Sequence, residues 1–147
     1  MKKVQVRECA NLPINADILY DIILDITKYY QWWPSKIELN ILRLTPNFIN
    51  SELEVRPPTL GTNFCFRIIE AIPHQKIVFE YFEGIQQGKG TWTFIPVDNI
   101  QTTVCYEVDV IAKGLMVNFV SVEELIRIQQ KFIQDLFSGI KRYKNLG

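Results

Sequence analysis

The 147-residue chain lacks several features that mark common classes of protein. Sixteen Lys and Arg balance sixteen Asp and Glu, so its formal net charge is zero. It therefore has no basic excess of the kind that binds nucleic acid or an anionic membrane. No uninterrupted apolar run approaches the roughly 20 residues that cross a bilayer, and residues 1–8 contain no apolar signal region. We expect a cytoplasmic protein with no nucleic-acid partner and no integral membrane segment.

The side chains that dominate catalytic and metal sites are also scarce. The only histidine, His74, lies between Pro73 and Gln75 in a predicted turn. Cys9, Cys65 and Cys105 are scattered singly with no C-x-x-C spacing, so we expect three reduced thiols. The sequence contains no phosphate-binding glycine loop, and residues 88–90 predict a hairpin turn instead. We expect neither a metal site nor a cofactor.

Aromatic residues are abundant, with nine Phe, six Tyr and three Trp. Such a surplus supplies large flat surfaces that line either a core or a pocket. The length fits one domain over residues 1–147, which is large enough to bury a core of its own.

The hydrophobic pattern predicts one strand, two helices, about six further strands and one long helix. Asn15 is a good N-cap for the first helix, and Pro34 stops the second helix after Trp33. The period-two segments that predict strands lie at residues 3–9, 37–43, 50–56, 61–68, 77–83, 90–95 and 102–112. From residue 117 the pattern returns to a helical period. An apolar stripe then runs for about six turns, from Val122 to Ile140.

Only one face of this last helix is apolar, so it needs a single apolar surface to cover. An antiparallel sheet with one solvated face provides that surface, and the sequence predicts an α+β fold. A short turn at residues 97–99 places Trp92 opposite Val104, and alternation then sorts the strand residues into two faces. The inner face takes Phe64, Phe66, Ile68, Ile77, Phe79, Tyr81, Trp92, Phe94, Val104, Tyr106, Val108 and Val110. The outer face carries a charged ladder of Arg67, Glu80, Lys89 and Glu107.

The aromatic inner face has two possible uses. The rings can pack against the last helix as a filled core, which the residues alone favour. They can also leave a pocket whose polar groups are two phenol hydroxyls and an indole N–H. If the protein is an enzyme, its acid and base must come from Tyr81, Tyr106, Glu83 or a pocket water.

Five segments in this order resemble the START-like superfamily, also called SRPBCC. The segment YYQWWP at 29–34 resembles a helix end found in its polyketide cyclase/dehydrase branch. The other four resemble strands of the same branch: GTNF at 61–64, PHQKIVFEY at 73–81, GTWTF at 90–94 and TTVCY at 102–106. The resemblance covers essentially the whole chain, and none of the segments is a catalytic signature.

The resemblance implies a helix-grip fold, in which a seven-stranded curved antiparallel sheet wraps around a long C-terminal helix and two short helices follow the first strand. It favours the pocket, and hence binding or transport of a small hydrophobic ligand of lipid, polyketide or aromatic type. A cyclase/dehydratase-like enzyme and a protein-interaction module with a filled core are the alternatives. The residues expected to bind the ligand are Trp33, Phe66, Phe79, Tyr81, Trp92, Phe94, Tyr106, Leu125 and Ile126.

Overall fold

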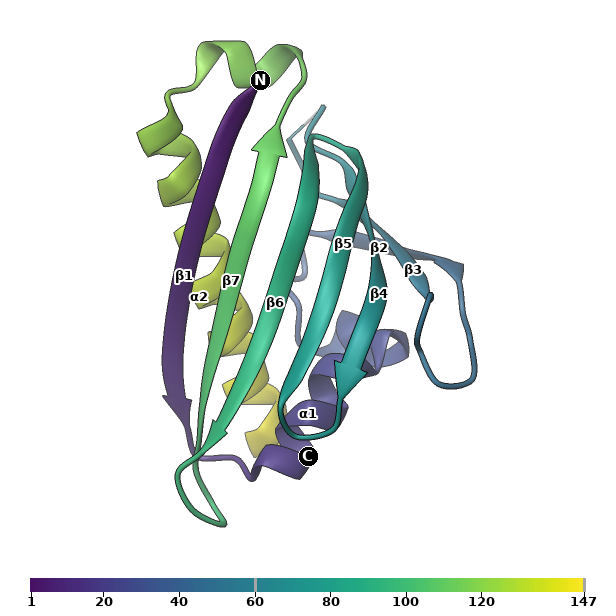
Figure 1. Ribbon diagram of the computed structural model, residues 1–147, viewed down its shortest axis with the longest axis vertical. Coiled ribbons are helices and arrows are strands. Elements are labelled where there is room, and N and C mark those ends of the chain that lie inside the picture. Colours follow the sequence, from purple (N-terminus) through teal and green to yellow (C-terminus); the bar gives the residue numbers. More distant parts are fainter. Residues whose placement is uncertain (60, 147) are drawn as a thin grey trace.

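A computed structural model describes residues 1–59 and 61–146 of the chain (Figure 1). The elements occur in the order β1 (Lys2–Leu12), α1 (Ala16–Leu24), the 3-10 helix η1 (Ile26–Gln31), β2 (Glu38–Arg43), β3 (Glu52–Arg56), β4 (Phe64–Ile72), β5 (Lys76–Gly84), β6 (Gln86–Pro96), β7 (Thr102–Ala112), the 3-10 helix η2 (Leu115–Phe119) and α2 (Val122–Leu146). This order confirms the predicted fold class.

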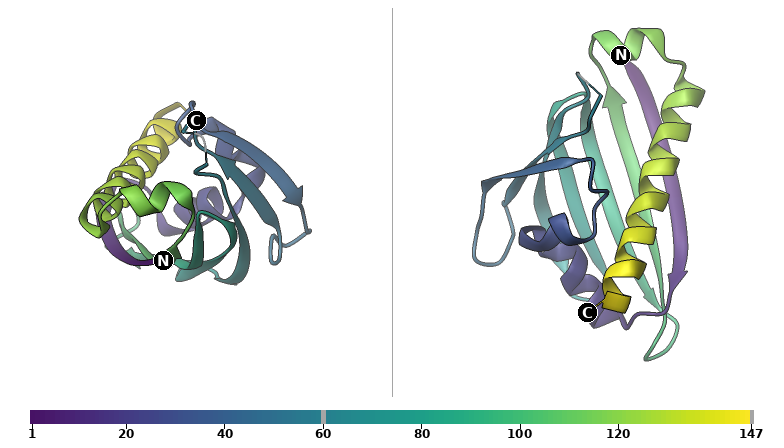
Figure 2. Two further views of the ribbon diagram at one scale, coloured as in Figure 1. Left: turned by 90° about the horizontal axis from the view of Figure 1, so that it is seen from above. Right: turned by 180° about the vertical axis from the view of Figure 1, so that it is seen from behind.

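The seven strands form one antiparallel sheet in the order β1-β7-β6-β5-β4-β3-β2. The first and last strands of the meander, β1 and β7, are neighbours, and the sheet curves around α2 (Figure 2). α1 and η1 lie beside the C-terminal end of α2, at the end of the sheet opposite to η2. Among the described helices, none is both long and apolar enough to cross a membrane.

The predicted inner and outer faces are confirmed, but the predicted register of the last hairpin is wrong by two residues. Trp92 lies opposite Tyr106, and Phe94 lies opposite Val104. The turn is longer than expected, because the Val97 amide donates to the Gln101 carbonyl and residues 98–100 form the tip. A shift of two residues keeps every side chain on its face, because the side-chain period of a strand is two.

Two local predictions need correction. Residues 88–90 lie inside β6, and the chain turns at Gly84 and Ile85 instead. Gly84 has a φ of 96°, and a Cβ there would meet the Asn63 carbonyl oxygen at 2.2 Å, so the tight link requires glycine. The helical segment after β7 begins with η2, and α2 itself starts only at Val122.

α2 is packed unevenly along its length. Its C-terminal half buries Ile133, Leu136, Phe137 and Ile140, whereas no residue from 118 to 132 is fully buried. The close contact at the C-terminal half depends on Gly139, where a Cβ would lie 1.9 Å from the Trp32 carbonyl oxygen. One end of the helix is therefore fixed against η1, while its first turns are less enclosed.

The outer face carries charged cross-strand pairs, as predicted. Arg67 lies 3.3 Å from Glu52 and 3.4 Å from Glu80, and Lys89 is the register partner of Glu80 on β6. These side chains are partly exposed, so each pair contributes little to stability. His74 is exposed in its turn, with Nε2 3.2 Å from an Asp17 carboxylate oxygen.

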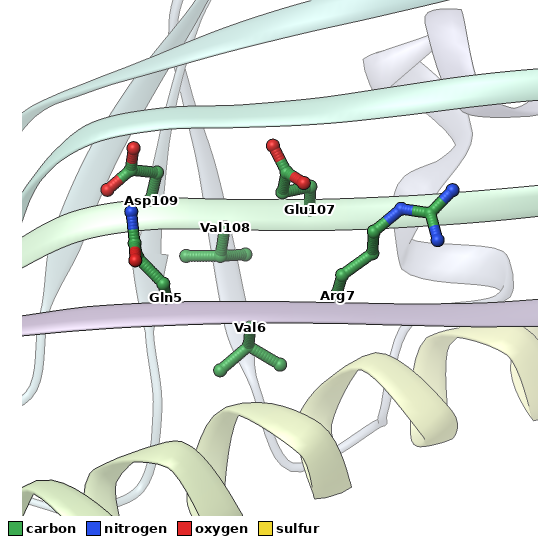
Figure 3. A pocket seen from close by; sticks show the side chains of 6 residues that line it. All are labelled: Gln5, Val6, Arg7, Glu107, Val108 and Asp109. Atoms are coloured by element: carbon green, nitrogen blue, oxygen red, sulfur yellow. The ribbon is translucent and has the colours of Figure 1, made fainter.

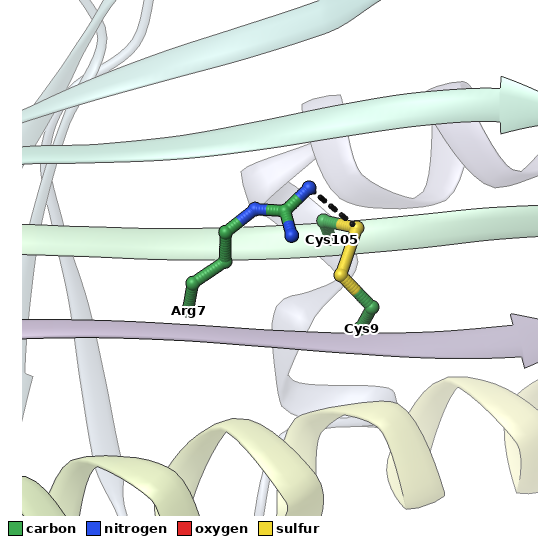
Figure 4. The surroundings of a disulfide bond; sticks show 3 residues. All are labelled: Arg7, Cys9 and Cys105. Atoms are coloured by element: carbon green, nitrogen blue, oxygen red, sulfur yellow. Dashed lines mark hydrogen bonds between the residues drawn. A yellow bond between two sulfur atoms is a disulfide. The ribbon is translucent and has the colours of Figure 1, made fainter.

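The prediction of three reduced thiols is wrong for two of them. Cys9 on β1 and Cys105 on β7 are register partners and form a disulfide, with the Arg7 guanidinium 3.5 Å from the Cys105 sulfur (Figure 4). Their positions are 96 residues apart in the sequence, so only the pairing of β1 with β7 brings them together. Cys65 is a free, buried thiol, and burial raises its pKa to about 11.

Candidate functional site

The nine residues predicted to bind a ligand belong to the apolar core or pack against it. Seven are buried, whereas Leu125 and Ile126 on α2 are half-buried. The rings form two close stacks, Phe66 on Phe79 at 4.2 Å and Trp92 on Tyr106 at 4.3 Å between ring centroids. Within this layer the aromatic rings contact one another, as the packed-core alternative expects.

A pair of tyrosines forms the polar centre of this layer. The hydroxyls of Tyr81 on β5 and Tyr106 on β7 are hydrogen-bonded to each other and buried. Gly90 on β6 makes room for the pair, because a Cβ there would lie 2.4 Å from the Tyr106 hydroxyl oxygen. Burial raises the pKa of both hydroxyls above the ordinary value of 10.0, so both phenols are neutral at pH 7. They can donate hydrogen bonds or act as weak acids, but they are poor bases.

Some buried donors have no partner among the described residues. They are Trp32 Nε1, Trp33 Nε1, Trp92 Nε1 and Arg67 Nε. Trp33 and Trp92 face α2 from inside the fold, each with its ring edge-on to a phenylalanine of that helix, Phe132 and Phe137 respectively. An unpaired buried donor costs roughly 1–3 kcal/mol, so native structures seldom retain one without a reason.

The third catalytic candidate is located elsewhere. Glu83 is exposed near the end of β5, opposite Cys65 on β4, and the raised pKa of Cys65 is partly due to its charge. Its parity along β5 matches that of Phe79 and Tyr81, although its position at the strand end predicts exposure. The register of β4 with β5 shifts between Cys65 and Phe66, however, and the strand end bearing Glu83 is open to solvent. The buried centre consists of neutral groups only.

The interior is least enclosed at the end near η2. There Gln129 on α2 donates to the side-chain oxygen of Gln86, which is buried at the start of β6. Beyond this amide pair, Leu115 and Phe119 of η2 are 76% and 81% exposed. Since the first turns of α2 are only half-buried at the same end, this is where a ligand has the least side-chain packing to displace.

Two surface depressions lie away from the aromatic layer. One, of about 270 Å³, is on the outer face of β1 and β7 among the polar side chains of Gln5, Arg7, Glu107 and Asp109 (Figure 3). The other, of about 390 Å³, is a groove between α1, η1 and the end of α2. It is lined by Ile18, Asp21, Ile22, Asp25, Lys28, Trp32 and Tyr143. Neither depression contains a residue predicted to bind ligand.

Sequence reasoning missed four residues that shape the site. Tyr29 is fully enclosed, stacks on Trp33 at 5.2 Å and donates its hydroxyl to the Ile23 carbonyl. Gly90 leaves space for the Tyr106 hydroxyl group. The hydrogen bond between the side chains of Gln86 and Gln129 links β6 to α2. The parity of β6 would have placed Gln86 and Gly90 on the inner face with Trp92, had the strand been predicted to start at residue 86.

Comparison with known proteins identifies the family. The family model described as polyketide cyclase / dehydrase and lipid transport matches residues 12–137. The chain belongs to this family. No curated protein matches it.

Solved structures of this family's fold are similar over almost the whole chain. A START superfamily protein from Mycobacterium smegmatis has a TM-score of 0.78 at 17% identity, covering 97% of this chain and 99% of its own. The Zhui aromatase/cyclase from Streptomyces sp. R1128 has a TM-score of 0.70 at 14% identity, covering 97% and 91%. The Aha1 protein from Colwellia psychrerythraea, solved as a dimer, has a TM-score of 0.62 at 14% identity, covering 92% of each chain. At these identities the similarity establishes the fold, which hosts several functions.

Proposed function

We propose that this protein binds a small, mostly apolar molecule between the concave face of the sheet and α2. The observation that carries the proposal is the buried aromatic layer with unpaired donors at Trp33 Nε1 and Trp92 Nε1. A layer that served only as a core would be expected to pair such groups or to use phenylalanine. Membership of a family described by cyclase and lipid-transport activities supports the same proposal.

Entry is proposed at the end near η2. The C-terminal half of α2 is held by the contact of Gly139 with the Trp32 carbonyl, and its first turns are half-buried. Elements with few buried contacts open at the lowest free energy. A small displacement of the first turns of α2 would therefore expose the aromatic layer while the rest of the fold stays intact.

Native mass spectrometry of the purified protein, compared with its denatured mass, tests the proposal directly. A retained small molecule would support it and reveal the chemical class of the ligand. Uptake of an apolar fluorescent probe provides the second measurement. A bare protein that also takes up no probe would refute ligand binding and favour the interaction module with a filled core.

A matched pair of variants locates the site. Ile126→Trp adds bulk at a half-buried position packed against the core, whereas Ile128→Trp adds the same side chain at a position that is 52% exposed. We expect Ile126→Trp to weaken probe uptake at least tenfold, since the larger ring occupies the entrance, and Ile128→Trp to leave it unchanged. Equal uptake by both variants would contradict the proposed location.

A cyclase/dehydratase-like activity is the second candidate, and the buried tyrosine pair favours it. A neutral phenol with a raised pKa can donate to a substrate carbonyl oxygen as negative charge develops on it. Turnover of the recovered ligand should then fall at least 100-fold in Tyr81→Phe or Tyr106→Phe, with binding retained. If the unmodified protein binds the recovered ligand but does not convert it, the enzymatic candidate is refuted and the carrier function remains.

A further inference from the structure

The strand β2 forms an open edge of the sheet. It is the last strand in the sheet order, so among the described strands only β3 pairs with it, and it lies at the opposite end of the sheet from β1 (Figure 1). Five of its six residues are exposed, and Leu39 alone is half-buried. The unpaired backbone N–H and C=O groups along such an edge can pair with a strand of another chain.

The side chains of β2 do not protect this edge. Natural edge strands commonly carry lysine or proline, which discourage pairing with another chain. β2 contains neither, and Ile41, Leu42 and the adjoining Leu44 are 41%, 47% and 54% exposed. Exposed apolar side chains beside unpaired backbone groups indicate an interaction surface.

A β-bulge in β2 determines which of its side chains share a face. The register of β2 with β3 shifts by one residue between Ile41 and Arg43, so Leu42 is an extra residue in the strand. The alternation of side chains is therefore displaced by one after the bulge. Arg43 lies on the outer face of the sheet with Glu38 and Asn40, whereas Ile41 lies on the inner face.

This order of residues makes β2 complementary to a second copy of itself. When two β2 strands are placed antiparallel about a twofold axis at Asn40, Glu38 of each copy lies opposite Arg43 of the other on the outer face. On the inner face Leu39 of each copy lies opposite Ile41 of the other, and the two Asn40 amides face each other at the axis. Opposite charges and apolar pairs at directly opposed positions stabilise neighbouring strands.

The charges needed for this pairing are not used within the chain. Neither Glu38 nor Arg43 forms an ion pair with another described residue. By contrast, Arg56 on β3 lies 2.9 Å from Glu54, so the neighbouring strand pairs its own charges. The Asn40 amide makes one long hydrogen bond of 3.4 Å to Glu54. The free charges therefore lie on the edge strand.

We propose that this protein forms a homodimer by antiparallel pairing of two β2 strands, which joins two seven-stranded sheets into one. The surface is separate from the aromatic interior, so the proposal does not depend on ligand binding. Pairing of two strands of six residues buries less area than the roughly 1,200–2,000 Å² of a stable interface. We therefore expect a reversible dimer with a Kd between about 10 and 500 µM.

Charge reversal at the edge tests the dimer and its register. Sedimentation velocity of the unmodified protein from about 5 µM to about 1 mM, in about 50 mM salt to limit screening, should show the dimer. Glu38→Lys and Arg43→Glu each bring like charges together at both ends of the pairing, so each should weaken dimerisation at least about tenfold. Glu123→Lys reverses an exposed charge of the same sign on α2, so this control should leave dimerisation unchanged.

An equimolar mixture of Glu38→Lys and Arg43→Glu provides the most specific measurement. In the mixed dimer every opposed pair of charges is again of opposite sign, so dimerisation should return to about the level of the unmodified protein. Recovery would also show that both variants are folded. Failure of the mixture to recover, or undiminished dimerisation of either single variant, would overturn the proposed pairing.

A covalent cross-link tests the position of the axis without changing a charge. Asn40→Cys places one thiol of each copy at the axis, so mild oxidation should produce a covalent dimer. Ser138→Cys is the control, because Ser138 is exposed on α2 and should not cross-link. Cys65 is buried and the other two cysteines are already paired, so the new thiol is the reactive one. An unmodified protein that stays monomeric at about 1 mM, together with no cross-link at position 40, would overturn self-pairing and leave this edge to a strand of a different protein.

Discussion

For the variant Gly139→Ala, the sequence and the structure predict changes in stability of opposite sign. On helix propensity alone, Gly139→Ala should stabilise α2 by up to ~1 kcal/mol. The structure predicts the reverse, because the added Cβ would lie 1.9 Å from the Trp32 carbonyl oxygen, about 1.5 Å inside the 3.4 Å at which ordinary contact begins. Both partners are backbone or attached directly to it, so no side-chain rotation can relieve the clash.

The helix must then move away from η1 and loosen the packing of Ile140 and Leu136. Forcing extra atoms into a packed interior costs roughly 1–3 kcal/mol, which exceeds the propensity gain. We expect Gly139→Ala to lower the free energy of unfolding by about 1–2 kcal/mol and Tm by roughly 3–8 °C. Urea titration followed by circular dichroism measures the first quantity, with unchanged m-values as the check on two-state unfolding.

Ser138→Ala is the control for this prediction. Ser138 is the exposed neighbour of Gly139 on the same helix, so its replacement should change stability by only a few tenths of a kcal/mol, in the stabilising direction. If Gly139→Ala proves as stable as the unmodified protein or more so, while Ser138→Ala behaves as expected, the close approach of α2 to the Trp32 carbonyl is refuted.

Three further predictions concern covalent and polar features of the fold. Replacing Cys9 and Cys105 by Ala should lower the free energy of unfolding by about 2–4 kcal/mol, because the disulfide closes a loop of nearly 100 residues in the unfolded chain; thiol titration of denatured, unreduced protein should find one free thiol, and a count of three would contradict the disulfide. Because burial raises the pKa of Tyr81 and Tyr106, the unfolded chain loses these protons first, so stability should fall from about pH 10 upward by up to ~1.4 kcal/mol per pH unit for each tyrosine. Urea midpoints between pH 8 and pH 11 measure this slope, which Tyr81→Phe should reduce. Gly90→Ala should destabilise by roughly 1–3 kcal/mol by displacing the Tyr106 hydroxyl, and a double-mutant cycle with Tyr106→Phe that shows no coupling would disprove that contact.

Much of the fold was predictable because it follows from patterns among residues that are close together in the sequence. The period-two segments and the long apolar stripe depend on neighbours two to four residues apart, and both were placed on the correct faces. The register error at the last hairpin arose because turn length depends on the Val97–Gln101 hydrogen bond, and no residue of that turn fixes its length unambiguously. The inner and outer faces were still predicted correctly, because the register error was an even number of residues.

The site was less predictable because its decisive contacts join distant residues. The disulfide needs the β1–β7 register, and the Tyr81–Tyr106 hydrogen bond spans 25 positions and crosses β6 at a glycine. Alternation along the strands could identify which aromatics face inward. It could not show that two indoles among them have no acceptor, since that depends on every neighbour of each ring.

The two ends of α2 therefore have separable consequences. At the C-terminal end Gly139 fixes the helix against Trp32, and changes there should alter stability more than binding. At the N-terminal end, where Leu125 and Ile126 are half-buried, changes should alter binding more than stability, because little packing is lost. A core without a ligand gains nothing from leaving one end of its covering helix partly packed. This arrangement is the physical reason to expect that Ile126→Trp and Gly139→Ala affect different measurements.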